Sequence, residues 1–600
     1  MAQRLVTWLC LLLLAGAAQA GPAQLHNRLA RHPSPYLALH GADPVAWQEW
    51  NAETVARAKR EDKLLFVSVG YYACHWCHVM QRESYKNAEI AGLLNRDFIP
   101  VKVDRELNTG LDDALQEFSA RLTKVSGWPL NAFVTPEGYP VYVVLYAPPD
   151  DFRKVLERLA ERWETDRAGL KKLAREAAPR QPQTLQRQTL DAARLARWES
   201  GFLQQLRAEM DELHGGFGEV SKFPMAPQLA LALELQAEKP DAKLESFLRL
   251  TLDQMAARGL MDHVNGGFFR YTTDPGWETP HFEKMLYDNA QLVPLYLRAA
   301  QVLKVPRYRE VALRTADFML DTLAAPAGGF YASTSAVDEA GREGAYYLWS
   351  REALERFLSA AEFAAARRVW KLDAPPPFEL GFLPAEWTAP TAAERPLLQT
   401  AAGKLSRQAR KSRQLPRDDK RNAGLNGLAL SALVAAARVA PRYRRPADEA
   451  YRFLRTQMMR PGGLYKSVAK GQKLAGAELE DYAFVVRGLL DYADLAGDKR
   501  ARKAAAELAQ TAWQRYADAR GWRRERQPLL ATVRPEAALA DGPLASPSAV
   551  LVSASLRLGD AQLARRAREA LRWYAQEMGE DPFSYATQIL ACRQAVTGRE

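Results

Sequence analysis

The chain has 600 residues, more than one compact core needs, so we expect two or more domains. Hydrophobic residues make up 48% of it and charged residues 26%, which is the composition of an ordinary globular protein. The formal net charge of +11 is spread along the chain and not concentrated in one segment, so we expect no nucleic-acid partner.

Residues 1–20 have the pattern of a secretory signal peptide. Arg4 is followed by an apolar stretch over 5–14 and then by small residues at 18–20 that are typical of a cleavage site. The stretch is short for a membrane-spanning helix, which needs roughly 20 apolar residues, and an uncleaved anchor is the alternative. We therefore expect a periplasmic or secreted protein with no membrane span after cleavage.

Residues 21–177 alternate between patterns typical of strands and of helices. The predicted helices cover 54–60, 79–94, 111–122 and a segment that begins near Asp150. The predicted strands cover 63–70, 98–103, 130–135 and 141–145. From the first strand onward the order is β-α-β-α-β-β-α, which is the order of a thioredoxin-like domain.

Cys74 and Cys77 stand at the turn from the first strand into the next helix. Two cysteines three residues apart on a first helical turn can reach disulfide distance with little distortion. The free N–H groups and dipole of the helix favour a thiolate at Cys74, so we expect Cys74 to attack and Cys77 to resolve the mixed disulfide. His75, when protonated, should stabilise the thiolate further and make the pair more oxidising.

A substrate surface is predicted beside this pair. Pro129 directly precedes the third strand, where thioredoxin folds place a cis-proline. We expect Trp76, Trp128 and Pro129 to hold a protein thiol or disulfide, with the backbone before Pro129 pairing like an added strand. Cys592 lies in an apolar helical stretch and is expected to be a buried structural thiol.

Two other uses of the cysteine motif remain alternatives. Cys74-x-x-Cys77-His78 matches the haem-attachment pattern, but a buried strand runs directly into it and no distal Met or His stands out. Cys74, His75, Cys77 and His78 are all possible zinc ligands, but there is no second Cys/His pair nearby in the sequence. We therefore expect no metal and no cofactor, the reactive group being the Cys74–Cys77 disulfide itself.

Residues 178–190 are rich in Pro, Gln and Arg and predict a linker. Residues 191–600 have the pattern of amphipathic helices almost throughout.

Paired glycines followed by an aromatic residue or leucine recur at 215–217, 266–268, 328–330 and 462–464, with a weaker Gly521-Trp522. Their spacing, interrupted by a Pro-rich insertion from Pro375, predicts a closed ring of about six helical hairpins with the glycine turns at one end. An irregular helical bundle is the alternative.

Several longer motifs closely resemble the spermatogenesis-associated protein 20 family. They include Ser34-Pro35-Tyr36-Leu37, Cys74-His75-Trp76-Cys77-His78, Val101-Lys102-Val103-Asp104-Arg105-Glu106, Gly127-Trp128-Pro129-Leu130-Asn131, Pro280-His281-Phe282-Glu283-Lys284, Asp418-Asp419-Lys420 and Leu479-Glu480-Asp481-Tyr482-Ala483. The resemblance covers essentially the whole mature chain and indicates a bacterial, exported member. It implies a thioredoxin-like domain followed by an all-α (α/α)6 toroid similar to six-hairpin glycosidases and sugar epimerases.

The chain departs from the family pattern in the toroid. Residues 333–338 hold one carboxylate where the family has an acidic Asp-Ala-Asp run, and Leu425 stands where a tryptophan is expected. A Ser-Gly-Asn motif is represented only by Pro547-Ser548-Ala549. Because toroids hold ligands at these places, the departures weaken a prediction of sugar chemistry.

Polar residues gather in two motifs of the predicted ring. They are His281, Glu283, Tyr287 and Asp288 in the first and Glu480 and Asp481 in the second. On inner helices they would face a central cavity, where paired carboxylates could act as acid and base on a glycosidic bond or His281 could move a proton at a sugar carbon. The alternative is structural, with Glu283 capping a helix and neutralised by a neighbouring cation.

The sequence thus predicts an exported thioredoxin-like thiol–disulfide oxidoreductase fused to a helical toroid that recognises a substrate or partner. The alternative is a toroid that binds or processes carbohydrate, with the thioredoxin-like part serving as a docking module. The expected partners are a protein thiol or disulfide and, in the alternative, a carbohydrate in the toroid cavity.

Overall fold

The computed structural model describes residues 25–178, 185, 187–573 and 577–598. The expected signal peptide, residues 1–20, lies outside these residues, as does part of the expected linker, 178–190. No helix in the described part of the chain is long and apolar enough to cross a membrane.

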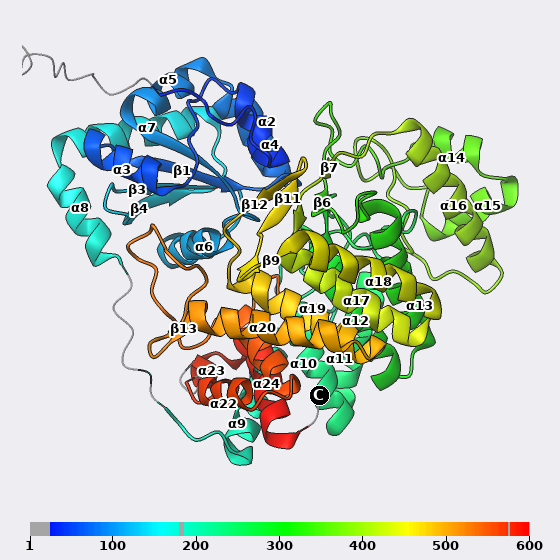
Figure 1. The fold of residues 1–600 in the computed structure, drawn as a ribbon. Helices are drawn as coiled ribbons and strands as arrows, with labels where there is room; N and C mark the ends of the chain where they lie inside the picture. Colours follow the sequence, from blue (N-terminus) through cyan, green and yellow to red (C-terminus); the bar gives the residue numbers. More distant parts are fainter. Residues whose placement is uncertain (1–24, 179–184, 186, 574–576, 599–600) are drawn as a thin grey trace, which may run out of the picture.

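A four-stranded sheet with the strand order β2-β1-β3-β4 forms the centre of the N-terminal domain (Figure 1). Its strands are β1 (Leu65–Gly70), β2 (Ile99–Asp104), β3 (Leu130–Val134) and β4 (Pro140–Val144). β1 is parallel to β2 and antiparallel to β3, which is in turn antiparallel to β4. Every residue of the first three strands is buried, because helices cover both faces of the sheet.

The helices of this domain follow the predicted order. They are α2 (Pro35–Leu39), α3 (Ala52–Glu61), α4 (His75–Met80), α5 (Ala88–Asp97), α6 (Thr109–Thr123), α7 (Pro149–Thr165) and α8 (Arg167–Glu176). The prediction of one helix over 79–94 was wrong. α4 runs into a π-helical turn, Gln81–Tyr85, and α5 begins anew where the Asn87 side chain accepts hydrogen bonds from the first free N–H groups.

The C-terminal domain, which begins at α9, is a closed ring of helical hairpins, as predicted. The inner helices are α10 (Ala226–Glu238), α12 (Leu286–Val302), α17 (Ala423–Val439), α19 (Leu479–Ala496), α21 (Pro547–Arg557) and α24 (Ala586–Thr597). Each contacts the next, and α24 contacts α10, which closes the ring. The outer helices are α9 (Ala192–Glu209), α11 (Ala242–Ala257), α13 (Pro306–Phe318), α18 (Arg444–Phe453), α20 (Lys499–Tyr516) and α22 (Ala561–Ala570), each against an inner helix. This is an (α/α)6 toroid.

Short β-hairpins lead from outer to inner helices, and all but the last of those named below carry the paired glycines. They join Met210 to Phe217, Met261 to Phe268 and Ala324 to Phe330, and further along the chain β9 (Met459–Arg460) to β10 (Gly463–Leu464) and β13 (Ala517–Asp518) to β14 (Gly521–Trp522). Gly267 shows why glycine is needed. Its φ is 73°, and a Cβ there would lie 2.3 Å from a ring carbon of Phe318.

An inserted helical module separates α13 from α17 and forms one side of the molecule (Figure 1). Its helices are α14 (Arg351–Phe357), α15 (Ala360–Val369) and α16 (Glu394–Ser412). They surround a hydrophobic cluster of their own, which Phe269 and Phe282 of the toroid loops join. The insertion therefore begins before Pro375, which lies between α15 and α16.

The thioredoxin-like domain lies against the hairpin end of the toroid (Figure 1). Lys420, between β7 (Arg417–Asp418) and β8 (Arg421–Asn422), is fully buried, and its Nζ lies 3.0 Å from Asp104 Oδ2 and 3.1 Å from Glu106 Oε2. Glu478, just before α19, accepts a hydrogen bond of 2.9 Å from the backbone N–H of Thr109 at the start of α6. The loop after β2 and the N-terminus of α6 thus cover this end of the ring.

Candidate active site at the domain interface

Cys74 and Cys77 form a disulfide at the N-terminus of α4, with their Cα atoms 5.3 Å apart. Cys74 caps the helix, and its Sγ accepts a hydrogen bond of 3.1 Å from the backbone N–H of Cys77. Gly70 ends β1 beside the pair, where a Cβ would lie 2.8 Å from Cys77 Sγ. The cysteines are 3% and 1% exposed, so exposure hardly differs between them, whereas Cys74 alone occupies the N-cap position of the helix.

Trp128, the residue before Pro129, is held by both domains. The peptide bond between them is cis, as expected for this position. The half-buried Trp128 ring lies 4.3 Å from the guanidinium carbon of Arg105 and 4.8 Å from that of Arg270, a toroid residue. Its Nε1 donates a hydrogen bond of 2.8 Å to Asp112 Oδ1. Trp76, in contrast, is 39% exposed on the open side of the disulfide.

The toroid places His281 directly beside His75 of the cysteine motif. The two rings are stacked, with centroids 5.5 Å apart and planes at 19°. Glu343, another toroid residue, lies against both: its Oε1 is 2.6 Å from His281 Nδ1 and its Oε2 is 3.4 Å from His75 Nδ1. Three side chains from two domains therefore meet at the N-terminus of α4.

The two imidazoles differ in their preferred charge. Burial lowers the pKa of His75 and so favours its neutral form. Burial also acts on His281, but the hydrogen bond and charge of Glu343 outweigh it and raise the pKa of His281. The sequence-based expectation gave the positive charge to His75, whereas the surroundings favour it on His281.

A second polar group behind this one contains Glu283, Tyr287 and Asp288. Arg270 donates a hydrogen bond to the hydroxyl of Tyr71 in the thioredoxin-like domain, and its Nη1 lies 3.8 Å from Glu283 Oε1. On the other side, Nη1 of Arg105 is 3.5 Å from the hydroxyl of Tyr287. Arg270 and Tyr287 of the toroid therefore contact the thioredoxin-like domain.

Asp288 and Glu283 retain free oxygens in this group. Burial raises the pKa of Asp288 to about 8; Arg270 acts in the opposite direction and Glu283 in the same direction. Neither Asp288 Oδ2 nor Glu283 Oε2 accepts a hydrogen bond from any of the described residues. Burial therefore favours the protonated form of Asp288.

Glu480 and Asp481 belong to a third group, at the start of α19. Lys466 Nζ lies 3.0 Å from Asp481 Oδ2 and 3.1 Å from Glu478 Oε2. Asp481 also accepts a hydrogen bond from the backbone N–H of Glu478 and completes a capping box. Burial raises the pKa of Glu480 to about 8. The two motifs that were expected to share one cavity are therefore parts of separate polar groups.

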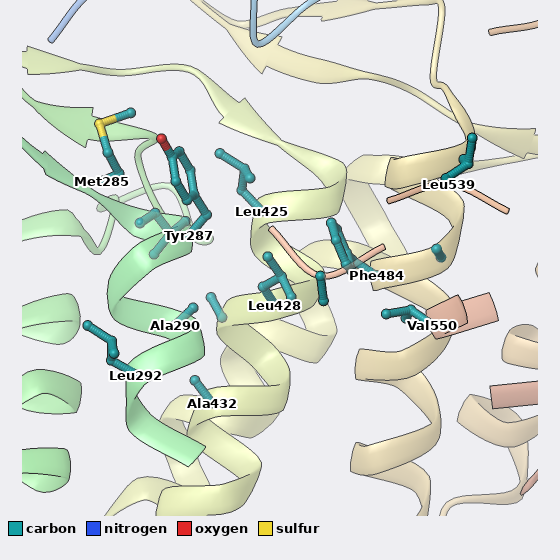
Figure 2. Close-up of a cluster of buried hydrophobic side chains, with 14 of the residues drawn as sticks. Met285, Tyr287, Ala290, Leu292, Leu425, Leu428, Ala432, Phe484, Leu539 and Val550 are labelled. Carbon is teal, nitrogen blue, oxygen red and sulfur yellow. The ribbon is translucent and has the colours of Figure 1, made fainter. Parts of the chain in front are cut away.

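The middle of the ring is apolar (Figure 2). Leu428, Phe484 and Leu539 belong to one buried cluster, which they reach from α17, α19 and the loop before α21. Leu425, where a tryptophan was expected, is buried in the same cluster. Apolar side chains thus pack between the inner helices, whereas the candidate carboxylates lie toward the end of the ring that the thioredoxin-like domain covers.

Two residues of the site, Glu343 and Arg270, were not identified from the sequence. Glu343 is 62 residues from His281 and lies at the end of a short hairpin that starts at Val337. Arg270 is a charged residue directly after the apolar Gly-Gly-Phe-Phe run, which was the only signal available. Both act through partners distant in sequence, so no local spacing indicates them.

Cys592 is a free, fully buried thiol, and burial raises its pKa, so it is expected to be unreactive. In the part of the chain that the structure describes, no three His, Cys, Asp or Glu side chains lie close enough to hold a metal ion.

Known proteins match both domains. The Thioredox_DsbH family model, described as a protein of unknown function, DUF255, matches residues 26–180. Human spermatogenesis-associated protein 20 is 34% identical over 535 residues, which cover 78% of this chain and 67% of the human protein. The chain belongs to the spermatogenesis-associated protein 20 family. An uncharacterized Caenorhabditis elegans protein is 30% identical over 551 residues, 83% of this chain and 74% of the nematode protein.

The toroid of this family member is also similar in fold to solved sugar-modifying enzymes. Cellobiose 2-epimerase from Spirochaeta thermophila has a TM-score of 0.42 and 16% identity, and the match covers 69% of this chain and 98% of the epimerase. A D-mannose isomerase has a TM-score of 0.45 and 10% identity, covering 68% and 98%. At these identities the likeness concerns the fold alone.

Proposed function

We propose that this member of the spermatogenesis-associated protein 20 family is a thiol–disulfide oxidoreductase whose reacting groups are Cys74 and Cys77. One observation supports this most: the cysteine pair lies at a helix N-terminus, and the toroid brings His281 and Glu343 against His75, the residue after Cys74. The toroid is thus part of the active site and not a separate unit.

The reaction follows from this placement. In the reducing direction the Cys74 thiolate attacks a substrate disulfide, forming a mixed disulfide and releasing one substrate thiolate. Cys77 then attacks Cys74 Sγ, re-forms the Cys74–Cys77 disulfide and releases the second thiolate, so two electrons pass to the substrate. The reverse sequence oxidises a dithiol. The N–H of Cys77 and the dipole of α4 stabilise the Cys74 thiolate in both directions.

The substrate in this proposal is a protein thiol or disulfide. Trp76 is exposed, and its ring lies 4.8 Å from that of Tyr146, so the two form an aromatic edge beside the disulfide. An extended substrate segment would pair with the backbone of Trp128, because the N–H and carbonyl of Gly127 are already bonded to the Gln116 side chain. The signal-like residues 1–20 support an exported protein, in a compartment where disulfides persist.

The toroid fold also suits the carbohydrate alternative, but the positions of its carboxylates favour the redox proposal. Glu283 and Asp288 lie beside Arg270, which is itself bonded to Tyr71 of the thioredoxin-like domain. They are 2% and 6% exposed, and the cysteines are as deeply buried, so either substrate needs a local opening at the interface. Glycoside chemistry needs two carboxyl groups open to the substrate on either side of the scissile bond.

The test is exchange with a disulfide-bonded peptide, followed by mass spectrometry. We expect turnover by the wild-type chain and by Cys592→Ser, the matched control. Cys74→Ser should abolish exchange, and Cys77→Ser should accumulate a mixed disulfide on Cys74 because nothing resolves it. Exchange that persists in Cys74→Ser, or a wild-type chain that never exchanges, would contradict the proposal.

A further inference from the structure

The group formed by His75, His281 and Glu343 joins charged side chains of both domains, which thiol–disulfide exchange alone does not require. A carboxylate lies between two imidazoles that come from different domains, 2.6 Å from one and 3.4 Å from the other. All three side chains are mostly buried, with exposed fractions between 14% and 27%. Charges in such partly dehydrated surroundings interact more strongly than charges in water.

The other charged groups around the two rings are few. His281 faces Glu343 and, further away, Glu283, and its ring packs on that of Tyr271 at 5.2 Å. His75 faces Glu343, His281 and Arg82. The His281–Glu343 pair therefore places a cation and an anion directly beside His75, at the Cys74 end of α4.

We propose that the toroid pair His281–Glu343 sets the acidity of the Cys74 thiol, so that the toroid tunes the redox pair of the other domain. This inference rests on the proposed redox function. His281 is a positioning residue, because it acts through the stacked His75 ring and through its charge and not by contact with the sulfur. With the ion pair intact, the carboxylate is neutralised and the thiolate forms readily.

The physical reason is the balance of charge. Loss of His281 would leave Glu343 as an uncompensated negative charge near Cys74, which disfavours a second negative charge on the sulfur. Loss of both residues would remove both charges and restore the balance. The two changes should therefore compensate each other, which damage to the packing would not do.

The experiment measures the pH dependence of alkylation of Cys74 in the reduced full-length chain, identified by peptide mass. His281→Gln should raise the pKa of the Cys74 thiol by about one unit. The double variant His281→Gln with Glu343→Gln should return it close to the wild-type value. The control is His214→Gln, which changes a toroid histidine 3.2 Å from Asp211, outside the site, and should leave the thiol unchanged.

An unchanged thiol pKa in His281→Gln, or a double variant shifted as far as the single one, would overturn the inference. Thermal unfolding of each variant shows whether it has folded, and the compensation in the double variant separates charge from packing. If the wild-type pair cycles normally but His281→Gln has no effect, only this inference fails. If the wild-type pair cannot be reduced and re-oxidised, the proposed function fails and the inference fails with it.

Discussion

Asp288 illustrates how the domain interface changes the chemistry of one residue. It lies in the first turn of α12, where a carboxylate is ordinarily favoured by the helix dipole. Burial instead raises its pKa to about 8, against the opposing effect of Arg270. The residue was identified from the sequence as a candidate acid, but its pKa depends on its burial and on Arg270, Glu283 and Arg105, which the folded structure brings around it.

This protonation predicts how stability varies with pH. Because the folded-state pKa of Asp288 is above its unfolded value, stability is full below about pH 4 and is lost as the pH rises toward 8. Asp288→Asn removes this loss, so the stability advantage of the variant over the wild type should grow by about 3–4 kcal/mol between pH 5 and pH 8. Urea unfolding of both proteins at both pH values measures this difference. Asp151→Asn, at an exposed position, is the control. If the free energy of unfolding changed with pH by the same amount in the wild type and in Asp288→Asn, the assignment of this pH dependence to Asp288 would be wrong.

At the scale of elements, the glycine turns are attached to the inner helices by a repeated hydrogen-bond pattern. Asn289 Oδ1 in α12 accepts from the N–H of Phe268 at 2.7 Å, and its Nδ2 donates to the carbonyl of Phe268 at 3.1 Å. Asn426 in α17 makes the same two bonds, at the same distances, with Phe330. An amide side chain can satisfy both backbone groups at once, which explains asparagine at both places.

Removal of one of these amides should destabilise the toroid. Asn289→Ala leaves a buried N–H and a buried carbonyl of Phe268 without partners, so we expect a loss of about 2–4 kcal/mol in the free energy of unfolding. Gln399→Ala, which removes an exposed amide on α16, serves as control and should change stability by less than about 0.5 kcal/mol. Equal stabilities of the two variants in urea unfolding would contradict the role of Asn289.

Element-scale features were also the most predictable from the sequence. The strand and helix order, the cysteine motif before α4 and the glycine turns all depend on residues a few positions apart. The break before α5 was missed although Asn87 is a good helix cap, because the apolar pattern continues through it. The meeting of His281 with His75 was not predictable, since it depends on how the domains pack.

On the scale of the whole molecule, Lys420 joins the domains through buried charge. It contacts Asp104 and Glu106 of the thioredoxin-like domain and Asp418 of the toroid. Burial disfavours its charge, but the three carboxylates outweigh burial and raise its pKa well above the ordinary value. Lys420 was part of a recognised motif, yet its role became clear only from the arrangement of the two domains.

Lys420→Met should uncouple the domains. Without the ammonium group, buried carboxylates face one another unpaired, and we expect a loss of at least about 3 kcal/mol. Calorimetry should then show separate unfolding of the two domains at temperatures below the wild-type transition. Lys404→Met, which removes a partly exposed ion pair with Glu362 in the inserted module, should have a small effect. An unchanged transition in Lys420→Met would contradict the coupling.

The redox role itself is tested most directly by a thiol titration of the mature chain. The protein is equilibrated with dithiol–disulfide buffers of graded potential, quenched with acid, alkylated and analysed by peptide mass. We predict that Cys74 and Cys77 change together in one reversible two-electron transition, with no added mass, while Cys592 stays unmodified until the protein unfolds. A pair that stays in one state across all potentials, or that carries a covalent adduct, would contradict the proposed oxidoreductase.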